Sequence, residues 1–526
     1  MSFQPQRRDL LLGAAAAAAA TALPQPQPAR ADNQTSPGQH RDDLAYRNAA
    51  DLVKALAAKQ ISSVELTDFA IARIEALDKP INAVVVRDFD RARAAAKAAD
   101  DALARGETRP LLGLPMTVKE AFGVTGLPTS WGNPKFRDWR PSVDALVITR
   151  LKAAGAVILG KTNVPLMLED WQSFNEIYGT TNNPWDLART PGGSSGGAAA
   201  ALATGFVELE LGSDIGGSLR CPAHFCGVFA HKPSLDLVPL RGAGPPHAPP
   251  WPGRSALAVA GPLARSAADL ALELDVIAGP DEMLDGVGYK LALPAARHND
   301  LKSFRALVID AHPLCPTAAS VRGALDRLAD GLARAGASVS RSERQVPDLA
   351  ETARVYVELL AAFRAANIPA EAYQRVETAA KALPPDDDSL AAARVRGIAF
   401  SHRDWTLASR IQARIRQQWR ELFKSVDVVL CPPMPTPAFP HDHAKDERTR
   451  QINIDGKEVA YFRQIVWASM ATMLGLPATV APIGHSEGGL PIGVQIIGPY
   501  LEDRTTIAFA GLIEREFGGF VPPSLR

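Results

Sequence analysis

The stretch that decides the fold lies near the middle of the chain and reads Glu210-Leu211-Gly212-Ser213-Asp214-Ile215-Gly216-Gly217-Ser218-Leu219-Arg220. The apolar run before it predicts a strand, its glycines predict a tight turn, and Pro222-Ala223 favour a helix beyond. Glycines beside a serine let backbone N–H groups converge on one point, as a tetrahedral oxyanion requires. Taken alone, the stretch is more often an ordinary strand-to-helix turn than a nucleophile.

Outward from this turn, short runs rich in Val, Ile and Leu alternate with helical patterns. The predicted strands are Ala83–Val86, Met116–Val118, Ala156–Leu159, Val207–Leu211, Ala306–Ile309, Val426–Leu430, Ala478–Ala481 and Val494–Ile497. Two predicted helices precede all of these strands, Leu44–Lys59 and Val64–Leu77, and the second opens with the capping box Ser62-Ser63-Val64-Glu65. Strands that alternate with helices predict an α/β fold with a mostly parallel or mixed sheet.

One long segment departs from this alternation. Residues 348–424 are predominantly helical and carry the acidic loop Pro384-Pro385-Asp386-Asp387-Asp388. The segment reads as an insertion over the sheet and does not look like a separate domain.

Composition narrows the function. The chain has 57 basic and 57 acidic residues, so it lacks the positive excess of a nucleic-acid-binding protein. Its four cysteines show no C-x-x-C spacing; most are expected to be buried, although a disulfide between Cys221 and Cys226 is left open. His441-Asp442-His443 reads as a polar loop and not as a metal site. We expect no metal at the functional site.

The amino terminus has the order of an export signal. Arg7-Arg8 precede an apolar run, Leu10–Leu23, that is too short to span a bilayer, and Ala29-Arg30-Ala31 close the segment. The paired arginines resemble a bacterial twin-arginine signal, although Gln6 stands where Ser or Thr is usual. We expect cleavage after Ala31, a polar spacer over residues 32–43, a periplasmic or secreted protein, and no stable membrane insertion after processing; a membrane anchor is the minor alternative.

Two patterns mislead if they are read alone. Residues 155–162, Gly-Ala-Val-Ile-Leu-Gly-Lys-Thr, match the phosphate-loop pattern, but the intervening residues resemble a strand and Pro165 follows closely. Residues 192–196, Gly-Gly-Ser-Ser-Gly, match the nucleophile elbow of α/β-hydrolases, which requires a strand before its serine. The preceding Asn182-Asn183-Pro184-Trp185-Asp186 predicts a loop, so neither match supports its usual function.

A third residue changes the interpretation. Lys119 ends a predicted strand, and together with the Gly192–Gly197 and Asp214–Arg220 blocks it resembles the amidase signature family. The order Lys, Ser, Ser fits that family. The match continues through Pro184-Trp185, His231-Lys232-Pro233-Ser234, Leu474-Gly475-Leu476-Pro477 and Gly493-Val494-Gln495-Ile496-Ile497-Gly498. The resemblance covers most of residues 45–517 and implies an α/β/α sandwich around a large mixed, mostly parallel twisted sheet. It also implies a single catalytic domain over residues 44–526, in which a helical region of about 300–425 is an insertion that shapes the substrate site.

The resemblance implies a Ser-cisSer-Lys triad. Ser218 would be the nucleophile and Lys119 the base, provided that burial or nearby positive charge lowers the lysine pKa. Ser194, on a cis peptide bond, would relay the proton between them. An acyl-enzyme would form and water would release the acid, with no metal or organic cofactor.

The same family pattern assigns supporting residues. Backbone N–H groups of Ile215, Gly216, Gly217 and Ser218 are expected to hold the oxyanion. Ser195, Asp214 and Arg220 are expected to hold the loop by hydrogen bonds. Trp131, Leu168 and Trp171 are the candidate substrate-pocket residues; Trp131 replaces an expected small residue and would narrow the pocket, whereas Trp171 fits a core position equally well. We expect the helical insertion and Cys431–Thr436 to complete the cavity.

These residues predict an amidase that hydrolyses a carboxamide to a carboxylic acid and ammonia or an amine, with esterase activity alongside. Its partner is a small-molecule amide, and a homodimer is left open. Alternatives are the catalytic A-type subunit of an amidotransferase, a hydrolase specialised for carbamates or esters, and a non-catalytic binding protein on a degenerate scaffold. The sequence does not name the substrate.

Overall fold

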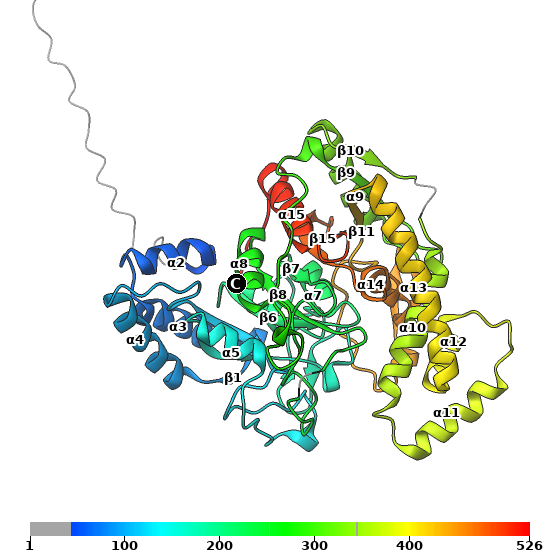
Figure 1. Ribbon diagram of the computed structural model, residues 1–526, viewed down its shortest axis with the longest axis horizontal. Coiled ribbons are helices and arrows are strands. Elements are labelled where there is room, and N and C mark those ends of the chain that lie inside the picture. The colour runs from blue at the N-terminus through cyan, green and yellow to red at the C-terminus, as the bar shows by residue number, and fades with distance from the viewer. Residues whose placement is uncertain (1–43, 252, 343–345, 526) are drawn as a thin grey trace, which may run out of the picture. The chain divides into compact units, whose positions relative to one another are not determined.

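The computed structural model describes residues 44–251, 253–342 and 346–525, and these belong to one compact unit (Figure 1). The predicted export signal, its cleavage after Ala31 and the spacer lie outside the described residues. Within the described ranges, no helix is both long enough and apolar enough to cross a membrane.

The first helices follow the sequence signals closely. Helix α2 spans Ala49–Ala57, α3 spans Ser63–Ile81 and α4 spans Phe89–Ala104. The predicted capping box is present at α3, where the Ser62 hydroxyl accepts from the Glu65 N–H and the Glu65 carboxylate accepts from the Ser62 N–H. Helices α3 and α4 pack against each other and α4 packs against strand β3, which places this layer over one side of the sheet.

An 11-stranded sheet crosses the described residues in the order β1-β3-β2-β6-β8-β7-β14-β15-β11-β9-β10. The strands are β1 (Val84–Arg87), β2 (Pro115–Lys119), β3 (Val157–Thr162), β6 (Leu209–Asp214), β7 (Phe229–Lys232), β8 (Val259–Ala264), β9 (Arg305–Val308), β10 (Ser338–Ser340), β11 (Val428–Cys431), β14 (Ala478–His485) and β15 (Pro491–Ile497). Every strand predicted from the sequence overlaps one of these. The α/β class and a large mixed sheet are confirmed.

The expectation of a mostly parallel sheet is wrong. Strand β2 is parallel to β3 and β6, and β9 is parallel to β10 and β11. Every other neighbouring pair in the sheet of the described residues is antiparallel. The centre of the sheet is built from antiparallel pairs because β7 and β8, and likewise β14 and β15, are direct neighbours in sequence order and return beside each other.

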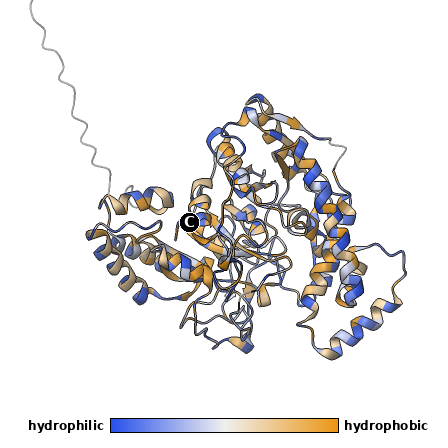
Figure 2. Ribbon diagram, in the orientation of Figure 1, coloured by the Kyte–Doolittle hydropathy of each residue, from blue (hydrophilic) through white to orange (hydrophobic). Residues whose placement is uncertain are grey.

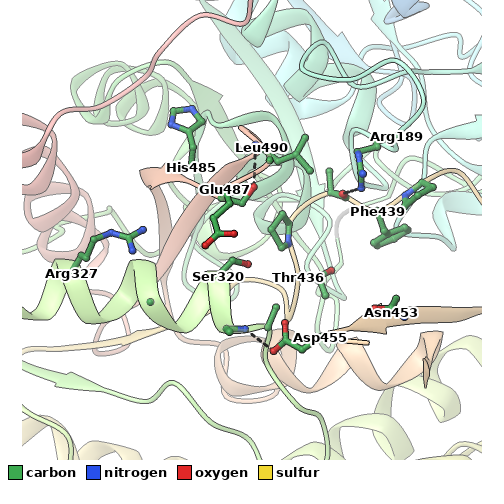
Figure 3. Close-up of a pocket in the computed structure, with 18 residues that line it drawn as sticks. Arg189, Ser320, Arg327, Thr436, Phe439, Asn453, Asp455, His485, Glu487 and Leu490 are labelled. Carbon is green, nitrogen blue, oxygen red and sulfur yellow. Dashed lines mark hydrogen bonds between the residues drawn. The ribbon is translucent and has the colours of Figure 1, made fainter. Parts of the chain in front are cut away.

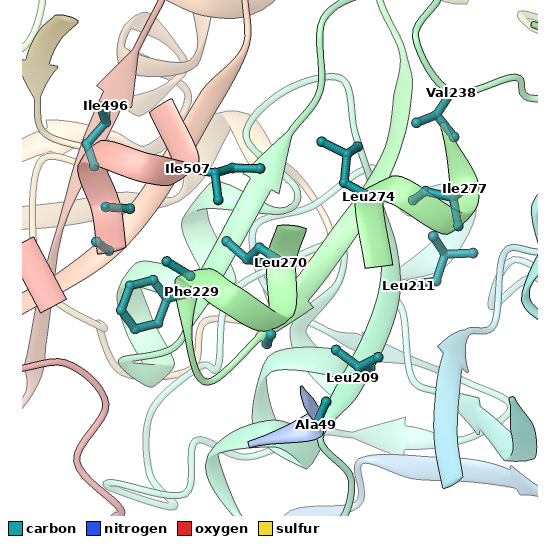
Figure 4. Packing of buried hydrophobic residues seen from close by; sticks show 14 of the residues in the cluster. Ala49, Leu209, Leu211, Phe229, Val238, Leu270, Leu274, Ile277, Ile496 and Ile507 are labelled. Carbon is teal, nitrogen blue, oxygen red and sulfur yellow. The ribbon is translucent and has the colours of Figure 1, made fainter. Parts of the chain in front are cut away.

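Helices cover both faces of the sheet. They are α5 (Leu146–Ala153), α6 (Gly196–Ala203), α7 (Arg220–Cys226), α8 (Ala267–Ile277), α9 (Ala319–Arg334), α14 (Ile465–Thr472) and α15 (Asp503–Phe517). One core packs Leu209 and Leu211 of β6 against Leu270 and Leu274 of α8 (Figure 4). A second core packs the opposite face against α3 and α6. Apolar burial on both faces accounts for the continuous Val, Ile and Leu runs of the strands.

The predominantly helical segment contains α10 (Leu349–Ala365), α11 (Ala370–Ala382), α12 (Leu390–Ile398) and α13 (His402–Ser425). Helix α10 packs against α12, α13 and α14, whereas no residue of α11 is buried (Figure 1). Hydrophilic and hydrophobic residues alternate along α13 (Figure 2). The amphipathic helix α13 therefore packs through one face and presents the other to solvent.

Short elements complete the described chain. Hairpins pair β4 (Phe174–Asn175) with β5 (Gly179–Thr180) and β12 (Gln451–Ile454) with β13 (Lys457–Ala460). The 3-10 turns are η1 (Pro134–Phe136), η2 (Leu166–Leu168), η3 (Asp285–Val287), η4 (Leu301–Ser303), η5 (Glu447–Thr449) and η6 (Tyr461–Gln464). Of these, η2 bears directly on the site, because two of its residues line the cavity over Ser218.

The two misleading motifs have the structures that their flanking residues predicted. Residues 157–162 of the phosphate-loop match are strand β3 and are buried, so no loop is present there to surround a phosphate. No strand leads into Ser194, and α6 begins only at Gly196. Cys221, Cys226, Cys315 and Cys431 are all free and buried, so the disulfide that the sequence left open is not formed.

Candidate active site

Two parallel strands bring the candidate residues together. Strand β2 ends at Lys119 and its parallel neighbour β6 ends at Asp214, so the loops that follow them emerge at the same edge of the sheet. Ser218 lies in the turn between β6 and α7, and Ser194 lies just before α6. The Ser195 N–H donates to the Ser218 carbonyl oxygen at 3.2 Å, which joins the two serine loops.

Lys119 lies at the centre of this arrangement. Its side chain is fully buried, and its Nζ donates to the Oγ atoms of Ser194 at 2.6 Å, Ser195 at 3.0 Å and Ser213 at 3.0 Å. The peptide bond between Gly193 and Ser194 is cis. Among the described residues no hydrogen bond joins the Ser194 and Ser218 hydroxyls, but both residues line the same cavity. The contact with Ser213 has no signal in the sequence pattern.

The surroundings of Lys119 favour its neutral form. Burial lowers its pKa to about 7, although the negative charges of Asp214 and Glu210 oppose the shift. A lysine in water has a pKa of about 10.4 and is almost entirely protonated at neutral pH. Lys119 is therefore able to accept a proton near pH 7.

The turn that carries Ser218 is held by a buried ion pair. Asp214 and Arg220 are fully enclosed and their charged groups lie 2.8 Å apart. The Asp214 carboxylate also accepts from the N–H groups of Gly217 and Leu219, each at 3.0 Å. Burial alone would raise the pKa of Asp214, but the charge and hydrogen bonds of Arg220 lower it to about 2. Asp214 thus stays ionised and fixes the turn.

The hydrogen bonds correct one predicted oxyanion donor. The Gly217 N–H donates to the Asp214 carboxylate at 3.0 Å and is therefore not free to bind an oxyanion. The N–H groups of Ile215, Gly216 and Ser218 have no hydrogen-bond acceptor among the described residues. The error arises because the family pattern gives the glycines but not the direction of each N–H, which the Asp214 bond determines.

Two aromatic side chains hold the carbonyl groups of the same turn. Trp171 Nε1 donates to the Gly216 carbonyl oxygen at 2.8 Å, and the Tyr356 hydroxyl donates to that of Ile215. Tyr356 lies on α10, and sequence reasoning did not find it because nothing local links residue 356 to residue 215. The Ile215 carbonyl shares its peptide group with the Gly216 N–H, and the Gly216 carbonyl shares its peptide group with the Gly217 N–H. The two bonds therefore fix two consecutive peptide groups of the turn that carries Ser218.

Ser218 opens onto a cavity of about 340 Å³, and only 6% of the residue is exposed. Ser194 lines the same cavity, and its apolar wall contains Phe122, Trp131, Met167, Leu168, Leu240 and Phe363. A smaller pocket of about 30 Å³ on another side of Ser218 is lined by Trp171 and also by Leu168. Trp131 and Leu168 thus line the cavity at Ser218, whereas Trp171 borders only the smaller pocket of the two.

The helical segment reaches this cavity through the end of α10, where Phe363, Arg364 and Asn367 line it. The expectation that Cys431–Thr436 also lines it is wrong, since neither pocket at Ser218 includes these residues. Thr436 instead lines a separate groove of about 800 Å³, which includes Arg327 and Glu487 (Figure 3). Neither Ser194 nor Ser218 lines that groove, so the larger hollow is not the candidate active site.

The chain is similar to known proteins over most of its length. The sequence pattern of the family described as Amidase matches residues 65–507. The chain belongs to the amidase signature family. The A-type subunit of the glutamyl-tRNA(Gln) amidotransferase from Anaeromyxobacter dehalogenans is 34% identical over 93% of this chain and 99% of its own length. Putative amidase AmiB2 of Mycobacterium bovis is 35% identical over 90% of this chain and 96% of its own.

Solved amidase signature structures share the fold. A bacterial aryl acylamidase has a TM-score of 0.74 at 25% identity, with 90% of this chain and 96% of its own covered. The A-type subunit of the Thermotoga maritima glutamyl-tRNA(Gln) amidotransferase has a TM-score of 0.73 at 25% identity, with 92% and 99% covered. The chain is therefore an amidase-family hydrolase, of a family that acts on carbon–nitrogen bonds.

Proposed function

We propose that this protein is an amidase that hydrolyses a carboxamide through an acyl-enzyme on Ser218. The observation that carries the proposal is the buried Lys119, whose Nζ contacts Ser194 beside the cavity that Ser218 lines. No hydrogen bond joins the Ser218 side chain to a histidine among the described residues, so we assign the role of base to Lys119, which contacts Ser194 beside the same cavity. The Ser194 and Ser218 hydroxyls are not hydrogen-bonded to each other in this structure. This is compatible with the proposal because hydrogen bonds at a catalytic site often tighten only when substrate binds.

The proposed reaction has two steps. Ser218 Oγ attacks the amide carbonyl carbon while its proton passes through the Ser194 hydroxyl to neutral Lys119. The N–H groups of Ile215, Gly216 and Ser218 stabilise the oxyanion. The same proton returns to the leaving nitrogen as the C–N bond breaks, which releases ammonia or an amine. Water then attacks the acyl ester, its proton returns to Ser218, and the carboxylic acid leaves.

The variants Lys119→Ala and Ser218→Ala test this proposal. Each should lower the release of amine or ammonia by about 10³-fold or more, because the loss of one member of a catalytic unit costs about as much activity as the loss of the whole unit. Ser320→Ala, in the separate groove, is the matched control and should retain full activity. A serine-directed fluorophosphonate should label Ser218, and peptide mass spectrometry would locate the label. Retained activity in either catalytic variant would refute the proposal.

A second function is favoured by the relatives that carry amidotransferase names. Under it, the chain would be the catalytic A-type subunit of an amidotransferase and would depend on partner subunits. The chain purified alone separates the two: an active, monodisperse amidase supports our proposal, whereas activity only with added partners supports the second. A panel of amides, carbamates and esters also tests the narrower alternative of a carbamate or ester hydrolase.

We further propose that the protein is exported and processed after Ala31. Support comes from the order of paired arginines, apolar run and small-residue site in the first 31 residues. The double variant Arg7→Lys, Arg8→Lys should keep the protein in the cytoplasm and leave it unprocessed, as cell fractionation and mass measurement would show. Export that is unaffected by the double variant would contradict a twin-arginine signal.

A further inference from the structure

Backbone strain is concentrated in the wall of the cavity over Ser218. Trp131, Met167 and Leu168 all line this cavity, and all have left-handed backbone conformations, with φ of 53°, 52° and 64°. Large side chains rarely adopt this conformation, and where they do the surrounding structure has to hold them. Residues with such strained backbone are frequent at ligand sites, where neighbouring contacts hold them in place.

A buried carboxylate holds Trp131. Glu120 is fully enclosed, and its Oε2 accepts the Trp131 N–H at 2.9 Å. Its Oε1 accepts from the Ser130 hydroxyl at 2.8 Å and from the Tyr178 hydroxyl at 3.2 Å. The Trp131 indole Nε1 donates to the Ala121 carbonyl oxygen at 3.0 Å. The backbone and the ring of Trp131 are thus each fixed by residues directly after the catalytic strand β2.

The rest of the wall depends on the same turn. The Met167 N–H donates to the Trp131 carbonyl oxygen at 2.7 Å, so the η2 turn is tied to the tryptophan. On the other side, Lys161 Nζ donates to the Pro128 carbonyl oxygen and to Thr129 Oγ1, each at 2.7 Å. Lys161 of β3 therefore holds the segment before Trp131, and Glu120 holds Trp131 itself. Displacement of Trp131 would also displace Met167.

The charges around the cavity favour an uncharged ligand. Four charged side chains line it, and each has an opposite partner: Glu169 with Arg364 at 3.6 Å, Asp214 with Arg220 at 2.8 Å, and Arg254 with Asp285 at 2.8 Å. The remaining wall is mostly apolar. At about 340 Å³ the cavity lies at the small end of the range for small-molecule sites, roughly 300–1,000 Å³.

From these contacts we infer that the substrate is an uncharged amide whose apolar group is about the size of one aromatic ring. Trp131 is the wall that limits that size, and Glu120 is the positioning residue that holds Trp131. This inference rests on the proposed amidase function but concerns its specificity, and the two can fail separately.

Propionamide, benzamide and 2-naphthamide test the size limit. The native enzyme should prefer benzamide. Trp131→Ala should raise kcat/KM for 2-naphthamide about tenfold and lower it for propionamide by a similar factor, since modest changes in an apolar pocket alter selectivity by roughly 10- to 200-fold. Trp139→Ala is the matched control, because Trp139 lies on the same loop, packs on His247 and does not line the cavity.

Glu120→Gln tests the positioning role. An amide N–H₂ cannot accept the Trp131 N–H, so the variant should weaken the preference for benzamide over 2-naphthamide in the native background. In the Trp131→Ala background, Glu120→Gln should change the ratio of kcat/KM for benzamide to that for 2-naphthamide less than twofold, because the indole ring that Glu120 positions is absent. An equal effect in both backgrounds would show that Glu120 does not act through Trp131.

The outcomes distinguish the two proposals. If fluorophosphonate labels Ser218 and amides are hydrolysed, but Trp131→Ala leaves the size preference unchanged, the inference is wrong and the amidase proposal stands. If no amide is hydrolysed and Ser218 is not labelled, the proposed function itself fails. Should Glu120→Gln not fold, Trp131→Ala and Trp131→Phe still decide the size limit, because Phe should give an intermediate preference.

Discussion

Lys119 is unusual because all of its hydrogen-bond partners among the described side chains are hydroxyl groups. A protonated amine in a buried site needs an opposite charge to offset its desolvation. Asp214 is already committed to Arg220, so it compensates Lys119 only in part. Burial with uncharged partners thus explains how a lysine, and not a histidine, can serve as the base of the proposed reaction.

The pH dependence of the proposed reaction follows from that burial. Neutral Lys119 is the active form, and its pKa is lowered to about 7. Below this value the protonated form dominates, so kcat/KM should fall about tenfold for each pH unit, and above it the rate should level off. Measurement of kcat/KM from pH 5 to 9, as an approximate working range, would check this expectation.

Fluorophosphonate labelling supplies the control for the pH profile. Because labelling of Ser218 uses the same base but no amide leaving group, its rate should follow the same curve. A flat profile for both reactions would contradict a base with a pKa near 7.

The residues that sequence reasoning missed share one physical cause. Ser213 stands in the deciding stretch without an assigned role, because only the tertiary structure brings its hydroxyl within 3.0 Å of Lys119. Gly217 was expected to be an oxyanion donor because the motif contains it, yet Asp214 takes its N–H. Motifs give residue types and spacing, but they do not give the direction of a backbone N–H.

At the scale of elements, helix α10 couples the helical segment to the catalytic turn. Tyr356 is fully buried in this helix, and its hydroxyl donates to the Ile215 carbonyl oxygen. The same helix ends at Phe363 and Arg364, which line the cavity. One helix therefore both supports the turn that carries Ser218 and closes part of the cavity next to it.

Tyr356→Phe should lower kcat about tenfold with little change in KM. The variant removes the bond to the Ile215 carbonyl, which shares its peptide group with the Gly216 N–H, a proposed oxyanion donor. Loss of one full donor costs about 10²–10³ in rate. A loosened donor should cost less. Steady-state kinetics on one amide would measure the effect, with Tyr373→Phe on the unburied helix α11 as the control. An unchanged kcat would show that the bond is dispensable.

The strands were predictable where an apolar run stood alone between turns, as for β2, β3 and β6. Strand β8 was missed because Gly261 and Pro262 interrupt it, and such residues normally argue against a strand interior. Strand β10 is only three residues long and gives too little pattern. The prediction of mostly parallel strands was wrong because strand direction depends on how each connection crosses the sheet. Local periodicity does not encode those connections.

At the scale of the whole molecule, stability does not depend on disulfides. All four cysteines are free and buried, and burial raises the pKa of both Cys315 and Cys431 to about 12. A thiol that is neither ionised nor accessible is inert. The stability of the fold should therefore be the same in a reducing and in an oxidising compartment.

Thiol titration would check that description. A disulfide-forming thiol reagent should react with none of the cysteines in the native protein and with all four after denaturation. The thermal midpoint should be the same with and without a reducing agent. A midpoint that falls on reduction would reveal a disulfide and contradict the structure.

The two halves of the sheet are joined through β14 and β15, which lie between β7 and β11 although they come near the end of the sequence. Arg220, which fixes the turn of Ser218, also donates to Thr472 of α14 and Gln495 of β15. The turn thus lacks part of its support until Gln495 has been synthesised. A nascent chain on the ribosome should therefore remain inactive through most of its own synthesis, even though Lys119, Ser194 and Ser218 emerge early.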